Sequence, residues 1–271
     1  MTAQVEAAPE LKTAPPARVG FTAVLRSERI KLTSVRSTWW TVVALVVLGA
    51  GLTTALCWGN AEWLASGDAD EAPGSFITVG MTLAQVCALV LGVLTASSEY
   101  GTGMIRTTLA ATPVRGRVLL AKAVLVAAVL MVAGTVTALL GYAGGNYFLD
   151  REGIGLALEG DVARAMYGSG LFLAGLGVLG VAVGFLVRHT AAAISIVLAQ
   201  IFVVEALVGL IPGSVGDWAA KLMPGNAGLQ IASPTTFIPD MLDPWPAFGV
   251  FSLEVAALLV LAWLMLRRRD A

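Results

Sequence analysis

The sequence predicts an all-α integral membrane protein in which six transmembrane helices form a single domain. Six apolar stretches of about 20 residues or more alternate with polar loops, and about 20 helical residues cross a ~30 Å hydrocarbon core. Hydrophobic residues make up 57% of the 271 residues, charged residues make up only 13%, and the mean hydropathy is +0.82. Too little chain remains outside the stretches for a soluble domain. The predicted spans are residues 39–58, 76–97, 123–147, 166–187, 191–211 and 245–266.

The placement of lysine and arginine predicts that both termini are cytoplasmic. These residues are frequent before the first span, between the second and third spans and after the sixth span. The alternate loops collect acidic residues, and their basic residues are only Arg151, Arg164 and Lys221. The net charge of −1 hides this asymmetry, so it says little about partners.

Residues 1–18 are rich in alanine, proline and glutamate. They contain neither an apolar core nor a small-residue cleavage site, so we expect a disordered N-terminal tail and not a signal peptide. Residues 19–271 then form the six-span domain.

Residues 20–38 predict an amphipathic helix that lies along the inner membrane surface and turns into the first span at Trp39. Glu28 interrupts its apolar stripe, and its basic residues lie mostly elsewhere. The stripe consists of Phe21, Val24, Leu25, Leu32 and Val35. Such a helix anchors the chain to the lipid surface or binds a partner, and the two roles are compatible.

A second cytoplasmic element follows the second span. Residues 103–111 fit a short helix that Pro113 stops. Glu99 stands at the membrane boundary, where a lone carboxylate is costly unless it is paired or solvated. Arg106 lies two helical turns further on, and it could pair with Glu99 or with a partner protein. The alternative is a solvated loop with an ordinary interfacial helix.

Three segments resemble type-two ABC exporter permeases of the kind common in high-GC actinobacteria. They are RSTWW at residues 36–40, SEYGTGMIRTTL at residues 98–109 and LMPGNAG at residues 222–228. The six spans, the amphipathic helix before the first span and the large outer loop before the sixth are also similar to that family. The resemblance therefore extends over nearly the whole chain.

The resemblance implies a permease dimer in a bacterial plasma membrane, a homodimer or a heterodimer, in which each copy pairs with a separate cytoplasmic ATPase. The helix after the second span would be the coupling helix that docks on the ATPase. The chain has no G-x-x-x-x-G-K-[ST] phosphate loop, so ATP and magnesium would bind to the partner. We expect no enzymatic activity, cofactor, metal or nucleic acid for this chain. The implied interface residues are Glu99, Tyr100, Gly101, Thr102 and Arg106.

The second span carries Thr78, Thr82 and Gln85 at helical spacing, with Gly92 further along. Because polar groups are penalised in lipid, this face should contact protein or a water-filled path. Helix packing is one interpretation. A translocation path is the other, which the resemblance favours because the second and fifth spans border the central path in that family.

The last two spans contain Gln200, Glu205 and Glu254. A charge at the centre of a span costs about 2.5–3.5 kcal/mol on insertion scales. Neither glutamate has an obvious basic partner at its depth, so each should be protonated, water-exposed or hydrogen-bonded to Ser, Thr or Gln. Either could bind a cationic substrate or a proton. Between these spans, residues 212–244 predict short interfacial or re-entrant helices on the outer side.

The sequence leaves two other functions open. One is a proton-coupled secondary transporter that uses Glu205 and Glu254 as a relay, although no clear internal repeat supports it. The other is a membrane anchor or sensor that recruits a cytoplasmic protein without transport. The transported substrate is open in every case.

Overall fold

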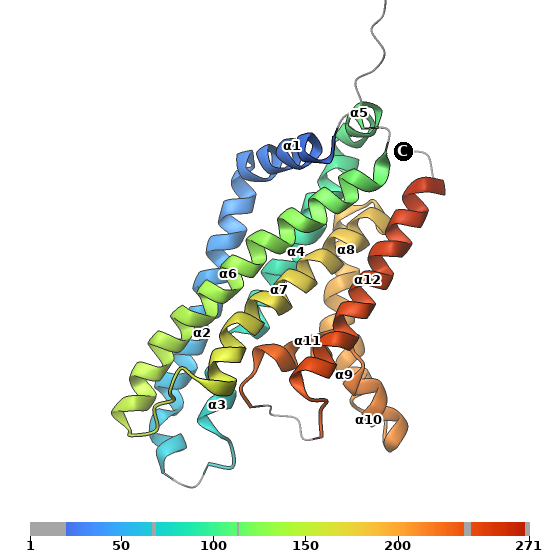
Figure 1. The fold of residues 1–271 in the computed structure, drawn as a ribbon. Helices are drawn as coiled ribbons and strands as arrows, with labels where there is room; N and C mark the ends of the chain where they lie inside the picture. Colours follow the sequence, from blue (N-terminus) through green and yellow to red (C-terminus); the bar gives the residue numbers. More distant parts are fainter. Residues whose placement is uncertain (1–19, 67–68, 113, 236–239, 269–271) are drawn as a thin grey trace, which may run out of the picture.

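The structure is a computed structural model that describes residues 20–66, 69–112, 114–235 and 240–268. Every regular element in these ranges is a helix. The long helices run side by side in a slanted bundle, with short helices at both ends (Figure 1). The predicted tail at residues 1–18 and the predicted helix stop at Pro113 lie outside the described residues.

The helices occur in the following order along the described chain. In the first half of the chain they are α1 (Phe21–Ser34), α2 (Arg36–Ala65), α3 (Pro73–Phe76), α4 (Met81–Gly101), α5 (Met104–Ala111) and α6 (Arg115–Arg151). In the second half they are α7 (Gly160–Val187), α8 (Thr190–Leu198), the π-helix η1 (Ala199–Val204), α9 (Glu205–Val208), α10 (Ser214–Lys221), α11 (Pro224–Leu229), the 3₁₀ helix η2 (Gln230–Ala232) and α12 (Pro244–Arg268).

Six helical segments of the described chain are long and apolar enough to cross a membrane. They confirm the predicted all-α, multi-pass architecture. The segments are Arg36–Ala65, Pro73–Gly101, Arg115–Arg151, Gly160–Val187, Thr190–Val208 and Pro244–Arg268. The largest difference from the prediction is in the third segment, which begins at Arg115 and not at residue 123. Lys122, which the sequence placed in a loop, is helical and buried there.

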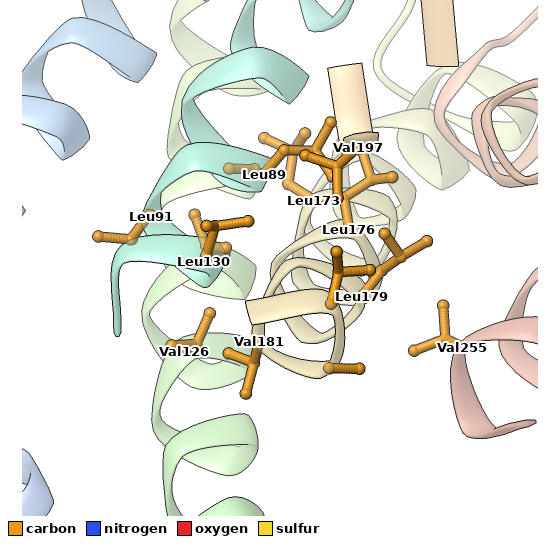
Figure 2. Close-up of a cluster of buried hydrophobic side chains, with 14 of the residues drawn as sticks. Leu89, Leu91, Val126, Leu130, Leu173, Leu176, Leu179, Val181, Val197 and Val255 are labelled. Carbon is orange, nitrogen blue, oxygen red and sulfur yellow. The ribbon is translucent and has the colours of Figure 1, made fainter. Parts of the chain in front are cut away.

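The core of the bundle surrounds α7, which packs against α4, α6 and α12. Figure 2 shows aliphatic side chains from these helices meeting in one cluster, among them Leu89 of α4, Leu130 of α6 and Leu176 of α7. Close approach of α4 and α7 requires small residues, because a Cβ on Gly92 would collide with the carbonyl oxygen of Gly177. Burial of such side chains stabilises the bundle wherever helix faces helix and not lipid.

The described N-terminal helix, α5 and the C-terminal end of α12 lie at one end of the bundle, which we call the α1/α5 end (Figure 1). There α1 crosses the bundle and buries Val24, Glu28 and Leu32, and the chain turns into α2 at Val35. This confirms an amphipathic helix leading into the first span, with Glu28 on its buried face. The predicted short helices of the outer segment are α10, α11 and η2, and α10 lies at the opposite end, which we call the α10 end (Figure 1).

Candidate functional site

Four charged side chains meet at the α1/α5 end, and we call them the four-charge cluster. They are Glu28 and Lys31 of α1, Glu99 of α4 and Lys122 of α6. The ammonium of Lys122 lies 2.7 Å from a carboxylate oxygen of Glu28 and 2.7 Å from one of Glu99. The ammonium of Lys31 lies 2.7 Å from Glu28 and 2.9 Å from Glu99. The cluster is therefore electrically neutral and joins three helices.

Each ammonium, which has three N–H donors, lies close to three oxygen atoms. Lys31 donates to Glu28, to Glu99 and, over 3.1 Å, to the hydroxyl of Thr108 in α5. Lys122 donates to Glu99 and, over 3.0 Å, to the carbonyl oxygen of Thr95, and it forms an ion pair with Glu28. The nitrogen of Lys31 thus contacts groups on α1, α4 and α5 at once.

Three members of the cluster are almost completely withdrawn from solvent. The exposed fraction of the side chain is 2% for Lys122 and 3% for Glu28 and Glu99, against 28% for Lys31. Burial of ions is tolerated only when their partners and hydrogen bonds are complete, and removal of one partner from a buried pair typically costs about 3–5 kcal/mol. The cluster is therefore a fixed junction between helices and not a set of surface ion pairs.

The pKa of the Lys31 ammonium is raised above its ordinary value. Its partial burial lowers this pKa, but the hydrogen bonds and negative charges of Glu28 and Glu99 outweigh that effect. A raised folded-state pKa means that the stabilisation is complete below the ordinary lysine pKa. It is lost as the pH rises through the raised pKa. Lys31 therefore stays charged across the physiological range.

Of the two partners considered for Arg106, Glu99 binds Lys31 and Lys122 instead. The helix does not continue from one residue to the other. It ends at Gly101, and Gly103 has a φ of 72°, a left-handed conformation that glycine adopts readily. The chain turns there into α5, on which Arg106 is exposed.

The five predicted interface residues divide by exposure. Glu99 is buried and Tyr100 is half-buried, whereas Gly101, Thr102 and Arg106 are exposed. The Tyr100 ring meets the ring of Phe185 edge-on at 6.1 Å, and the Arg188 guanidinium lies 5.3 Å from its centre. Glu99 and Tyr100 therefore support the α1/α5 end from inside, and only the other three present a surface to a partner.

Helix α5 is anchored on one side and open on the other. Ile105 and Leu109 are buried, while Met104, Arg106 and Thr107 are exposed. Thr108 links it to Lys31 of the four-charge cluster. A short helix held on its apolar side in this way offers a defined surface at the end of the bundle.

The polar face predicted for the second span is only partly present. Thr78 and Gln85 are buried, but Thr82 is exposed. Residues 77–80 form turns in which the amide of Met81 donates to Thr78 and that of Thr82 to Val79. These i to i+3 bonds shift the helical phase, so the prediction that Thr82 shares this face is wrong. Gly92 packs on Gly177, which favours helix packing at that depth.

Toward the α10 end, Glu205 is buried and binds a backbone amide. Its carboxylate accepts a 2.7 Å hydrogen bond from the amide of Gly225, near the start of α11. Directly before Glu205, the fifth segment widens into the π-helix η1. Gln200 lies in this π-helix, and its amide nitrogen is 3.8 Å from the sulfur of Met223. The polar residues of the fifth segment thus hold the α11 segment, through a backbone amide that the sequence did not suggest.

Glu254 of α12 differs from Glu205. It is half-buried, and one of its carboxylate oxygens is buried without a hydrogen-bond partner among the described residues. The two carboxylates are close enough to interact electrostatically. A cavity of about 650 Å³ beside Glu205 is also lined by Asp217, Asp240 and Lys221. An excess of acidic over basic groups there suits a cation better than an anion.

In the described ranges, no three His, Cys, Asp or Glu residues gather closely enough to hold a metal ion. Cys57 and Cys87 are both free.

Sequence reasoning identified Glu99 but missed Glu28, Lys31 and Lys122 as its companions. A signal was present: Glu28 lies four residues from both Val24 and Leu32, and Lys122 four residues from both Val118 and Val126. A charge at the centre of an apolar helical stripe indicates a buried ion pair, although the sequence alone does not say with which partner.

No protein-family model matches the chain, and no curated protein matches it significantly. The functional assignment therefore depends on the resemblance of the three sequence segments and on the geometry of the two sites.

Proposed function

We propose that this chain is the permease subunit of an ATP-driven exporter in a bacterial plasma membrane. Two copies would work with two separate ATPase subunits that bind ATP and magnesium, and the α1/α5 end would face the cytoplasm. The observation that carries the proposal is the attachment of α5, through Thr108 and Lys31, to the buried four-charge cluster. The resemblance supplies the dimer, the ATPase and the direction of transport.

The arrangement suits a transmission element. A partner that binds the exposed side of α5 would act on a helix whose other side is fixed to the bundle by Ile105 and Leu109. Displacement of α5 would pull on Lys31, which contacts Glu28 of α1 and Glu99 of α4. Because Lys122 binds both glutamates, α6 would follow. Motion at the partner surface would thus reach two membrane-crossing helices through a few ionic contacts.

A translocation path would then run along α4 and the fifth segment, toward the acidic cavity beside Glu205. The cavity and the π-helix η1 next to it support this position, since π-helical turns inside α-helices are frequent at functional sites.

Co-purification from the native membrane tests the proposal. The tagged wild-type chain, Arg106→Glu and Arg151→Glu would be isolated in mild detergents, and their companions identified by mass spectrometry. Arg106 is exposed on α5, and Arg151 is exposed at the far end of α6, so the two variants make the same charge change at opposite ends. We expect an ATPase subunit with the wild type and with Arg151→Glu, and a large loss with Arg106→Glu.

Two results would count against parts of this assignment. Equal recovery of the ATPase subunit with Arg106→Glu would mean that the ATPase docks elsewhere than on α5. If the wild type brings no ATPase in any mild detergent, the exporter assignment fails. A proton-coupled transporter then becomes the better candidate, because Glu205 and Glu254 interact electrostatically and one oxygen of Glu254 is buried without a hydrogen-bond partner among the described residues. Transport that follows a proton gradient without an ATPase would establish it.

A further inference from the structure

A cavity of about 280 Å³ opens beside the four-charge cluster, between α1, α2 and α4. Its wall is mainly apolar, with Leu32, Leu91 and Leu94 among the contributing side chains. At one end it meets Glu28, Lys31, Glu99 and Lys122. A mainly apolar wall with a charged end suits an amphipathic occupant.

At the charged end of this cavity each ammonium already lies within 3.1 Å of three oxygen atoms, so the unused groups there are acceptors. The second oxygen of Glu99 is buried and has no hydrogen-bond partner among the described residues. Lining hydroxyls on Thr41, Thr95 and Ser98 donate to the carbonyl four residues earlier, which leaves their oxygens as acceptors. A group that satisfies these hydroxyl oxygens must donate hydrogen bonds, and a charged donor makes the stronger ones.

Where α2 begins, the cavity offers hydrogen-bond donors instead of acceptors. Val35, Ser37 and Thr38 line the same cavity, and Val35 occupies the position before the first helical residue. No side chain caps this end of α2, so amides of its first turn are without a side-chain acceptor. Arg36 is exposed beside them. The start of a long helix with an adjacent arginine favours an anionic group.

We propose that this cavity binds the headgroup of an aminophospholipid such as phosphatidylethanolamine. Its primary ammonium would donate to the hydroxyl oxygens of Thr41, Thr95 and Ser98, which line the cavity. Its phosphate would lie at the start of α2 near Arg36, and its acyl chains would leave over the apolar wall. A choline headgroup has the same charges but no N–H donor, and the hydroxyls of a glycerol headgroup donate without the added strength of a charge, so both fit less well.

Bound in this position, the lipid would fill the space between α1 and α4 beside Glu99. It would brace the junction through which α1 is held to the bundle. The inference does not depend on an ATPase partner, and its test measures lipid binding alone.

Native mass spectrometry of the delipidated full-length protein can compare its affinities for lipids with different headgroups. Phosphatidylethanolamine, phosphatidylcholine and phosphatidylglycerol with identical acyl chains would be titrated against the wild type and three variants. Thr41→Phe and Leu94→Phe fill the cavity from α2 and from α4, and neither touches a charge of the cluster. Thr82→Phe makes the matched change on an exposed face of α4 away from the cavity.

We expect the wild type and Thr82→Phe to bind phosphatidylethanolamine about tenfold more tightly than the other two lipids, the value of one charge-assisted hydrogen bond. The preference should vanish in Thr41→Phe and Leu94→Phe. Equal affinity of the wild type for all three lipids would overturn the inference, as would a preference that both filling variants keep. Soluble phosphoethanolamine should not displace the lipid at millimolar concentration, and displacement would assign the site to a soluble amine phosphate instead.

Discussion

Glu99 and Lys122 show how a membrane protein keeps charges away from water at the edge of its bundle. Each charge is close to two of opposite sign, and Lys122 also donates to the carbonyl oxygen of Thr95. For stability, this mutual pairing of the four charges matters more than any single contact. A buried charge without its partner lowers the free energy of unfolding by far more than the intact pair raises it.

Lys122→Met tests this directly. The change leaves Glu28 and Glu99 with only Lys31 between them, so two buried carboxylates share one counter-charge. We expect the free energy of unfolding in detergent to fall by about 3–5 kcal/mol. Lys221→Met, which removes a half-buried lysine near Trp218, should cost about 1 kcal/mol or less. Denaturant titration of both variants gives the comparison, and similar losses would mean that the cluster is not a special junction.

Glu205 is predicted to fix α11 through its hydrogen bond with Gly225. Glu205→Ala removes the acceptor and should accelerate hydrogen exchange at the amides of α11 by about tenfold or more, as expected for an unsatisfied buried amide. Glu205→Gln keeps a carbonyl oxygen at this position and should change exchange little. Asp217→Ala, at an exposed acidic residue of the neighbouring α10, is the matched control. Unchanged exchange in Glu205→Ala would show that the carboxylate has another role.

The helices that depend on local sequence signals could be predicted from the sequence. Residues 103–111 were expected to form a helix, and α5 spans Met104–Ala111. The amphipathic character of α1 was predictable in the same way, from the helical spacing of its apolar residues. The widening of the fifth segment into η1 was not, because a π-helical turn depends on the neighbours against which the extra residue packs. The start of α6 was misplaced because Lys122 reads as a loop cation until its buried partners are known.

The link between α1 and α5 through Lys31 makes a prediction for both helices. Lys31→Met removes the shared donor to Glu28, Glu99 and Thr108, so α1 and α5 should both open more often. Hydrogen exchange by mass spectrometry should show faster exchange in α1 and α5 and no change in α7. Arg29→Met, an exposed position on α1, is the control. Faster exchange in α1 alone would mean that α5 is held by Ile105 and Leu109 and not by the cluster.

At the scale of the whole molecule, the sequence was sufficient to predict the six long apolar helical segments found among the described residues, since length and hydropathy define them. The sequence alone could not predict the four-charge cluster, because the members of the cluster come from α1, α4 and α6 and meet only when the bundle forms. The same is true of the amide that binds Glu205. Orientation and partner are properties of the membrane and of other chains, so they need experiments on the protein in its own bilayer.

Site-specific crosslinking in the native membrane provides that experiment. Met104 is exposed on α5, and Trp218 is exposed on α10 at the opposite end. Each would be replaced by cysteine, treated with a short cysteine-to-amine crosslinker in intact membranes, and its products identified by mass spectrometry. We predict that Met104→Cys captures a cytoplasmic subunit containing a G-x-x-x-x-G-K-[ST] phosphate loop and that Trp218→Cys captures none. Capture of that subunit from Trp218→Cys, or its absence from Met104→Cys, would contradict the proposed role of α5 as the docking helix.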